Sequence, residues 1–240
     1  PEIPMQMLEI AKKTSEQYPE RIVPFISPTE KKAPTVNARK LKDMLLVYPN
    51  LFKGYGEIGI YDTIYWKADD FAPDSPLFLE TYPIVEEHNL IVYFHPGERH
   101  EDNFEQVLSD YPNIIFIVHG EEIEESIGDL MDKHENIYYT IDFSFGEHFP
   151  LFVGKNKEEF MVSVENDFDK LIADDLRRWE KLIKKHPDRF MWGTDRGDAV
   201  WNYDQDVGLF LVKYARAFIG KLDPSVQEKF AYKNAEKLIS

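Results

Sequence analysis

The chain contains no cysteine, so it can build neither a disulfide scaffold nor a thiolate-based site. It has no run of 18 or more apolar residues, which argues against a membrane-spanning helix. Basic residues are scarce: 28 Lys and Arg stand against 44 Asp and Glu, for a net charge of −16. Phosphate contacts need clustered cations, so this balance argues against a nucleic-acid partner. We therefore expect neither nucleic acid nor membrane among the partners.

The start of the sequence also lacks familiar features. Residue 1 is Pro1 rather than methionine, and no charged and apolar leader follows, so no targeting signal can be read. We expect the supplied chain to begin inside a larger protein, and the cytoplasm is the favoured location. The 240 residues are 43% hydrophobic, enough for the core of one barrel-sized domain spanning 1–240. The acidic pairs Glu121-Glu122 and Glu124-Glu125 are expected to be solvated helix faces.

One unit recurs six times along the chain. A helix-like segment ends in a polar triplet such as Tyr48-Pro49-Asn50, and an apolar strand follows. The strands are continuous apolar runs, which is typical of a parallel sheet covered on both faces. The predicted strands are residues 21–27, 51–57, 90–95, 114–119, 137–142 and 189–195.

The segments between the strands have helical periodicity. One stripe comprises Leu41, Met44, Leu45 and Tyr48, and a longer one comprises Phe168, Ile172, Leu176, Trp179 and Ile183. Ser75 and Pro76 are suited to the cap and first residue of another helix, which Pro83 should bend. Regular alternation of strand and helix predicts βα units.

The strands end at a nearly constant register. Seven or eight positions after the middle of each triplet stands a polar residue: Ser27, Glu57, His95, His119, Asp142 and Asp195. In an α/β barrel such positions surround the C-terminal mouth, where active sites are built. We therefore predict the α/β class and a (β/α)8 TIM barrel.

Two histidines at matching heights on consecutive units indicate a metal site. Either His95 or His119 alone could be a satisfied core histidine, but neutral imidazoles converging on one point are suited to a metal. Glu57 and Asp195 complete a plausible nitrogen and oxygen ligand set, unless Glu57 instead pairs with a buried Lys or Arg. Zinc is the favoured ion, and manganese and iron accept the same ligands. Such a site would activate water for attack on a carbonyl or related centre.

These segments resemble the amidohydrolase superfamily, in particular its amidohydrolase-related TIM-barrel metal-dependent hydrolases. The resemblance spans about residues 18–240 and lies in GYGEIG, VYFHPGE, FIVHG and MWGTDRG, with NIYYTIDFS and YKNAEKLI in support. It implies that His95 ligates metal and that His119 binds a second metal or orients the nucleophilic water. Asp195 would ligate metal and act as general base. The group also contains decarboxylases and lactonases.

The chain departs from this family in its histidine spacing. The family's first strand carries His-x-His, two ligands on one face of a strand. No two of the seven histidines here, at 88, 95, 100, 119, 134, 148 and 186, are two residues apart. We expect the first strand to lie upstream of Pro1; the alternative is that the ligands were lost. A further strand at 62–66 is a poor candidate.

Substrate contacts are expected after the strand ends. Arg99 and Arg196 follow the candidate ligands and could bind a substrate carboxylate, or they could neutralise neighbouring acids. Asp142 and His148 are further substrate-binding candidates. An insertion at about 143–167 would sit over the mouth, where His148 with Phe149, Phe152 and Phe160 could form an aromatic lid, or the segment could form a homodimer contact.

Three functions remain open beside a metal-dependent hydrolase of a small carboxylated or cyclic molecule. One is a decarboxylase of the same group. Another is a TatD-like metal-dependent nuclease, whose glutamate strand GEIG resembles, although the acidic balance and the GTD sequence argue against it. The third is a degenerate barrel that only binds.

Overall fold

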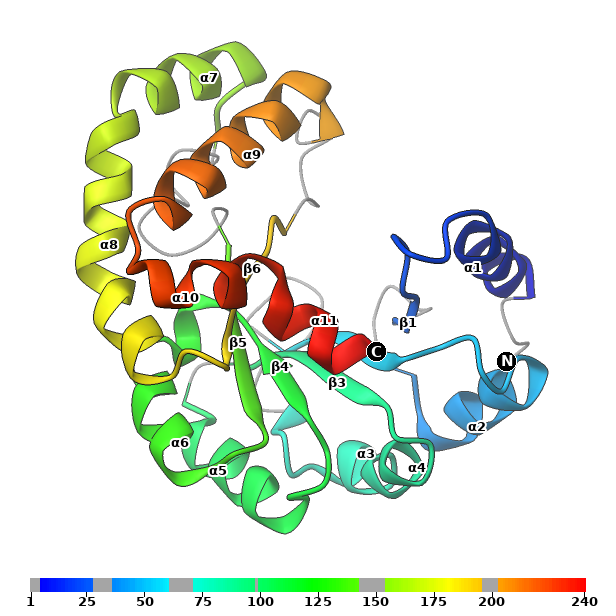
Figure 1. Ribbon diagram of the computed structural model, residues 1–240. Coiled ribbons are helices and arrows are strands. Elements are labelled where there is room, and N and C mark those ends of the chain that lie inside the picture. The colour runs from blue at the N-terminus through cyan, green and yellow to red at the C-terminus, as the bar shows by residue number, and fades with distance from the viewer. Residues whose placement is uncertain (1–4, 28–35, 61–70, 98, 143–153, 196–202) are drawn as a thin grey trace. The chain divides into compact units, whose positions relative to one another are not determined.

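The computed structural model describes residues 5–27, 36–60, 71–97, 99–142, 154–195 and 203–240 (Figure 1). Its contacts divide the chain into two compact units. Unit 1 spans Pro1–Tyr138 with Ile239, and unit 2 spans Tyr139–Leu238 with Ser240. The single-domain assignment over 1–240 stays a prediction.

Six strands form a parallel sheet in the order β1-β2-β3-β4-β5-β6, so each strand lies beside the next one along the chain. All six predicted strands are confirmed. Their bounds are Phe25–Ile26 (β1), Gly54–Gly59 (β2), Ile91–His95 (β3), Phe116–Val118 (β4), Ile137–Ile141 (β5) and Phe190–Trp192 (β6). The poor candidate strand at 62–66 lies outside the described residues.

The helices of unit 1 bury the predicted apolar stripes. They are α1 (Met5–Gln17), α2 (Ala38–Val47), α3 (Pro76–Leu79), α4 (Tyr82–Glu87), α5 (Glu101–Asp110), the 3-10 helix η2 (Glu121–Ile123) and α6 (Ile127–Lys133). Helix α2 buries Leu41, Met44 and Leu45, as predicted. The expectation that Pro83 bends one helix was wrong: Pro83 lies in the first turn of α4, where a missing N–H costs no hydrogen bond, so two short helices form.

The helices of unit 2 are longer. They are α7 (Lys157–Asn166), α8 (Phe168–Lys185), α9 (Gln205–Ile219), α10 (Pro224–Glu228), the π-helix η5 (Lys229–Lys233) and α11 (Asn234–Ile239). In α8, Ile172, Trp179 and Ile183 are buried, which confirms the second stripe. No helix within the described ranges is both long and apolar enough to cross a membrane.

Phe160 belongs to the core of unit 2, and its predicted place in an aromatic lid was wrong. Its side chain is 0% exposed and its ring meets that of Phe210 edge-to-face, with centroids 5.8 Å apart. A capping box between Asn156 and Glu159 begins α7, and Phe160 is one of the residues that this helix buries. The other lid candidates, at 148, 149 and 152, lie outside the described residues.

The core of unit 1 is largely aromatic. Phe94 of β3 stacks on Phe104 of α5, with ring centroids 5.5 Å apart, and Phe104 meets Phe116 of β4 edge-to-face at 5.6 Å. All three rings are fully buried. Because these rings fill the space between α5 and the sheet, they hold the ends of β3 and β4 at fixed positions.

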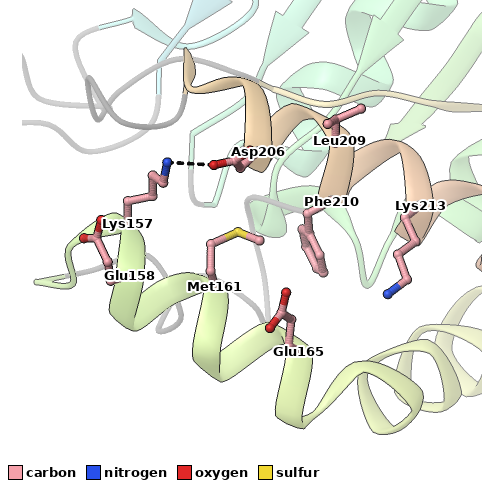
Figure 2. A pocket seen from close by; sticks show the side chains of 8 residues that line it. All are labelled: Lys157, Glu158, Met161, Glu165, Asp206, Leu209, Phe210 and Lys213. Carbon is pink, nitrogen blue, oxygen red and sulfur yellow. Dashed lines mark hydrogen bonds and ion pairs between the residues drawn. The ribbon is translucent and has the colours of Figure 1, made fainter.

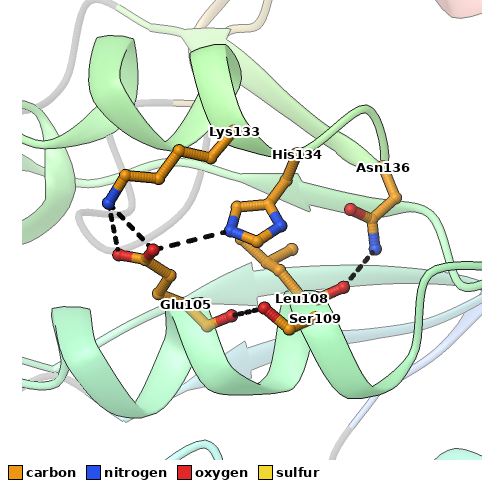
Figure 3. A network of polar contacts seen from close by, with 6 residues as sticks. All are labelled: Glu105, Leu108, Ser109, Lys133, His134 and Asn136. Carbon is orange, nitrogen blue, oxygen red and sulfur yellow. Dashed lines mark hydrogen bonds and ion pairs between the residues drawn. The ribbon is translucent and has the colours of Figure 1, made fainter.

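The buried side chain of Asn136, just before β5, binds the segment between α5 and β4 (Figure 3). Its side-chain N–H groups donate to the carbonyl oxygens of Leu108, Tyr111 and Ile114, at 3.1–3.2 Å. The Leu108 carbonyl is one of the last four of α5, which have no partner within the helix. Near Asn136, at the protein surface, Lys133 and His134 face the carboxylate of Glu105.

We predict that Asn136→Ala lowers the free energy of unfolding by about 1–3 kcal/mol, because it removes the donor from the buried carbonyls of Leu108 and Ile114. Urea denaturation measures the change. The matched control is Asn113→Ala, which removes an exposed hydrogen bond to Glu86 and should cost less than about 0.5 kcal/mol. Equal losses in the two variants would contradict the role given to Asn136.

Candidate metal centre

His95 and His119 lie side by side at the carboxyl ends of two neighbouring strands. His95 ends β3, His119 follows β4, and the register pairs the residues just before them, Phe94 with Val118. The spacing of the sequence had put the two histidines at one level, and the register agrees. The ring centroids are 4.5 Å apart, and the residues are only 2% and 0% exposed. Tyr93 stacks on the His119 ring at 4.9 Å, nearly in parallel.

Glu57 reaches this pair from a bulge in β2. Tyr55 pairs with Val92 and Ile58 pairs with Phe94, so two residues of β2, Gly56 and Glu57, lie opposite the single residue Tyr93. The expectation that Glu57 is level with His95 was therefore wrong, because Gly59 is the residue that pairs with His95. A bulge re-aims a side chain, and here the side chain brings the carboxylate to the histidines.

The bulge requires glycine at position 56. Gly56 has φ 134°, a backbone conformation that residues with side chains rarely adopt. A Cβ atom there would also collide with the carbonyl oxygen of Tyr93. Gly56, the second glycine of GYGEIG, is thus needed for the bulge that directs the Glu57 side chain toward the histidines.

The three side chains form one donor cluster. Glu57 Oε1 lies 3.2 Å from His119 Nε2 and 3.8 Å from His95 Nδ1. One ligand atom from each residue lies within 4.8 Å of the other two. Two buried imidazoles and a carboxylate are the donors that Zn²⁺ or Mn²⁺ accepts, so the residues fit a divalent ion. The alternative, in which Glu57 pairs with a buried Lys or Arg, is not what the described residues show: its ion-pair partners are the two histidines.

Glu122 is a fourth member of the site that the sequence reasoning missed. Its Oε2 lies 2.9 Å from His95 Nε2, and its side chain is only 13% exposed. The prediction that Glu121-Glu122 is a solvated pair is wrong for Glu122, because η2 turns that residue back toward β3. The available signal was a glycine directly after the strand end His119, followed by acidic residues.

The charges of the site support one another. Burial alone would raise the pKa of Glu57, but its contacts with His119 and His95 outweigh burial and hold that pKa well below its usual range. Burial lowers the pKa of His95, whereas its hydrogen bond to Glu122 and the nearby carboxylate of Glu57 prevail and raise it. The pKa of Glu122 is lowered in the same way, its contacts with His95 overcoming burial. Both carboxyl groups are therefore ionised at neutral pH.

Two further predicted site residues, Asp142 and Asp195, follow β5 and β6. Asp142 and Asp195 belong to unit 2, where Ile141 pairs with Trp192. The expectation that the two stand at one level was wrong, because Gly193 is level with Asp142 and Asp195 lies two residues beyond it. Asp195 has φ 40°, in the left-handed region that Asp tolerates better than most residues. That Asp195 and Asp142 share a site with Glu57 stays a prediction.

Of the predicted arginines, Arg99 is described. It is exposed and has φ 63°. A bulky residue in this left-handed conformation is an outlier of the kind that clusters at functional loops. Arg196 and His148 lie outside the described residues.

Unit 2 has a groove of about 480 Å³ between α7 and α9 (Figure 2). Met161 and Phe210 point into it, and Lys157 pairs with Asp206 at 3.0 Å at one end. The lining comprises Lys157, Glu158, Met161, Glu165, Asp206, Leu209, Phe210 and Lys213. Among the described residues, its lining includes none of Glu57, His95 and His119, so the groove is distinct from the donor cluster.

We predict that Gly56→Ala destabilises the protein by more than Gly154→Ala does. Both glycines have positive φ, at 134° and 70°, but a Cβ atom at Gly154 meets nothing within 4 Å. Gly154→Ala should therefore show only the conformational cost, about 1–2 kcal/mol, whereas Gly56→Ala adds a collision with the β3 backbone. Denaturant unfolding of both variants measures the difference, and indistinguishable losses would show that the bulge does not need glycine.

Solved structures of similar fold cover nearly the whole chain. A 2,6-dihydroxybenzoate decarboxylase in complex with 2,6-dihydroxybenzoate has a TM-score of 0.57 and 13% identity, over 98% of this chain and 76% of that one. A dihydroxybenzoic acid decarboxylase from Polaromonas sp. JS666, with bound manganese and the inhibitor 2-nitroresorcinol, has a TM-score of 0.55 and 13% identity, over 98% of this chain and 74% of that one. An amidohydrolase from Burkholderia multivorans with bound zinc has a TM-score of 0.55 and 12% identity, over 96% of this chain and 78% of that one. These likenesses show the TIM-barrel fold.

The sequence comparisons identify the family. No curated protein matches the chain. The family model Amidohydro_2, described as amidohydrolase, matches residues 14–240, which is nearly the whole sequence and includes every residue of the donor cluster. The chain belongs to the amidohydrolase family.

Proposed function

We propose that the chain is a metal-dependent hydrolase that cleaves an amide, lactone or related carbonyl bond of a small molecule. One observation carries the proposal: the donor atoms of Glu57, His95 and His119 converge within 4.8 Å at the carboxyl ends of consecutive parallel strands. This edge of a barrel sheet is where catalytic residues gather. Membership of the amidohydrolase family supports the same conclusion.

Glu57, His95 and His119 would hold the ion, through Oε1 of Glu57 and ring nitrogens of the histidines. A divalent ion there lowers the pKa of bound water and polarises a carbonyl group. Zinc is the proposed ion, and the structures of similar fold with bound zinc and bound manganese support a divalent metal.

The residues of the chain fix the geometry of this site. Glu57 is ionised because its pKa is held low, so its oxygen is ready to act as a ligand. His119 is clamped between the Tyr93 ring and Glu57, and His95 is held by Glu122. Preorganised donors of this kind need little rearrangement when a ligand enters.

Substrate contacts are proposed from the positions of charged residues along the sequence. The exposed guanidinium of Arg99 follows β3 and suits a bidentate contact with a substrate carboxylate. Asp195, two residues beyond the level of Asp142 on the neighbouring strand, is the proposed proton acceptor of the reaction. Arg196, His148 and Asp142 complete the proposed set.

We predict that the purified protein binds close to one equivalent of zinc or manganese. His119→Ala and Glu57→Gln should each weaken metal binding by more than about 100-fold, which exceeds the loss expected for a residue that only contacts a ligand. Elemental analysis and chelator competition measure this. The control is His88→Ala, which removes an exposed histidine after α4 and should leave affinity unchanged. A metal-free protein would refute the metalloenzyme and leave the barrel as a binding module.

A decarboxylase is the second candidate, because two of the structures of similar fold are decarboxylases of dihydroxybenzoic acids. The two reactions differ in their products. Hydrolysis of a lactone releases a carboxylic acid and hydrolysis of an amide releases an acid and an amine, whereas decarboxylation releases CO₂ and the parent phenol. We predict cleavage within a panel of lactones and amides, lost in Glu57→Gln; titration detects the acid from lactones, an amine reagent detects amide cleavage, and a CO₂ sensor detects the alternative. CO₂ release from dihydroxybenzoates without lactone or amide cleavage would replace the hydrolase by the decarboxylase.

A further inference from the structure

The imidazole of His95 lies between two carboxylates. Its Nδ1 lies 3.8 Å from Glu57 Oε1, within the donor cluster, and its Nε2 lies 2.9 Å from Glu122 Oε2. The two nitrogens are on different edges of the ring. Glu122 is not a member of the group whose ligand atoms all lie within 4.8 Å of one another. Glu122 therefore contacts His95 at Nε2, whereas Glu57 of the cluster faces Nδ1.

The chain makes room for the contact between His95 and Glu122. Gly120 has φ 101°, and a Cβ atom at this position would run into the His95 ring and lie 2.8 Å from Glu122 Oε2. Any side chain at position 120 would therefore occupy the space in which the hydrogen bond is formed. The backbone turn at Gly120 also starts η2, which carries Glu122.

The backbone of η2 is fixed on both sides of this contact. Ile123 is 1% exposed, so its side chain anchors η2 in the core. Glu124 N–H donates to the Glu121 carbonyl at 3.3 Å, and Ser126 N–H donates to the Ile123 carbonyl at 3.2 Å. A carboxylate on an anchored turn loses less conformational freedom when it binds His95 than one on a loose loop.

A neutral imidazole carries its proton on one nitrogen and offers a lone pair on the other. An acceptor at 2.9 Å from Nε2 keeps the proton there, which leaves the lone pair of His95 on Nδ1, toward Glu57 and His119. We infer that Glu122 is a positioning residue that fixes His95 in the Nε2–H tautomer and so presents Nδ1 to the ion. This inference rests on the proposed metal centre.

Zinc affinity is the first test. Glu122→Ala should weaken zinc binding by about 10–100-fold, measured by competition with a chelator. Glu122→Gln keeps an oxygen acceptor for Nε2–H and should recover part of the loss. The matched controls are Glu121→Ala and Glu125→Ala, which remove exposed glutamates of the same segment and should leave affinity unchanged. A Glu122→Ala affinity equal to that of the controls would overturn the inference.

The bound nitrogen of His95 is the second readout, and a merely structural role would not move it. In the zinc-loaded protein labelled with ¹⁵N-histidine, the His95 signals should show zinc on Nδ1 and a proton on Nε2. Glu122→Gln should retain this pattern, and Glu122→Ala should lose it or mix it with the other tautomer. Zinc on Nε2 in the unaltered protein would overturn the inference, even if Glu122→Ala fails to fold.

Zinc X-ray absorption separates positioning from direct ligation. At saturating zinc, the number of nitrogen and oxygen atoms bound to zinc should be the same in the unaltered protein and in Glu122→Ala; loss of one would make Glu122 a ligand and refute the inference. The failure of the proposed function is distinct from all these outcomes. It would appear as absence of zinc binding by the unaltered protein, whereas the inference fails only in a protein that binds zinc.

Discussion

The parallel register of β2, β3 and β4 is the constraint on which the candidate site depends. Parallel strands all present their carboxyl ends at one edge of the sheet, so parallel pairing alone brings together the side chains at the ends of neighbouring strands. The pairing of Phe94 with Val118 brings His95 and His119 to one level. The bulge at Gly56 and Glu57 shifts the register of β2 by one residue, so that Gly59 pairs with His95 and the Glu57 side chain reaches the histidines.

The electrostatics of the site follow from its burial. Imidazoles and carboxylates are costly to bury unless each has a partner, and here each histidine has a carboxylate within 3.2 Å. Two ionised carboxyl groups, Glu57 and Glu122, carry a charge of −2, which a divalent cation would balance. In a chain of net charge −16, such a site attracts cations before any specific contact forms.

Much of the fold could be predicted from the sequence because βα units give a repeating pattern of helical periodicity, polar triplet and apolar strand. Proline and asparagine punctuation located all six strands, since in these triplets the two residues favour the turn that ends a helix. The same spacing found His95 and His119. It could not find the bulge, because one extra residue in β2 looks the same in sequence as a strand that starts one residue earlier.

Glu122 was missed for a different reason. Paired glutamates after a strand usually lie on a solvated surface, and only the tertiary turn at Gly120 distinguishes Glu122 from its exposed neighbour Glu121. Phe160 was misplaced because an aromatic residue within an insertion is equally compatible with a lid and with a core, and only packing against Phe210 decides.

Asn136 also constrains the order in which this part of the chain can be completed. The carbonyls that it binds belong to Leu108, Tyr111 and Ile114, which precede it by 28, 25 and 22 residues. During synthesis these carbonyls are made before Asn136, and that of Tyr111 has a local donor in the Ile114 N–H, at 3.1 Å. The junction of α5 and β4 therefore gains its Asn136 hydrogen bonds only after the residue that begins the approach to β5 has been made.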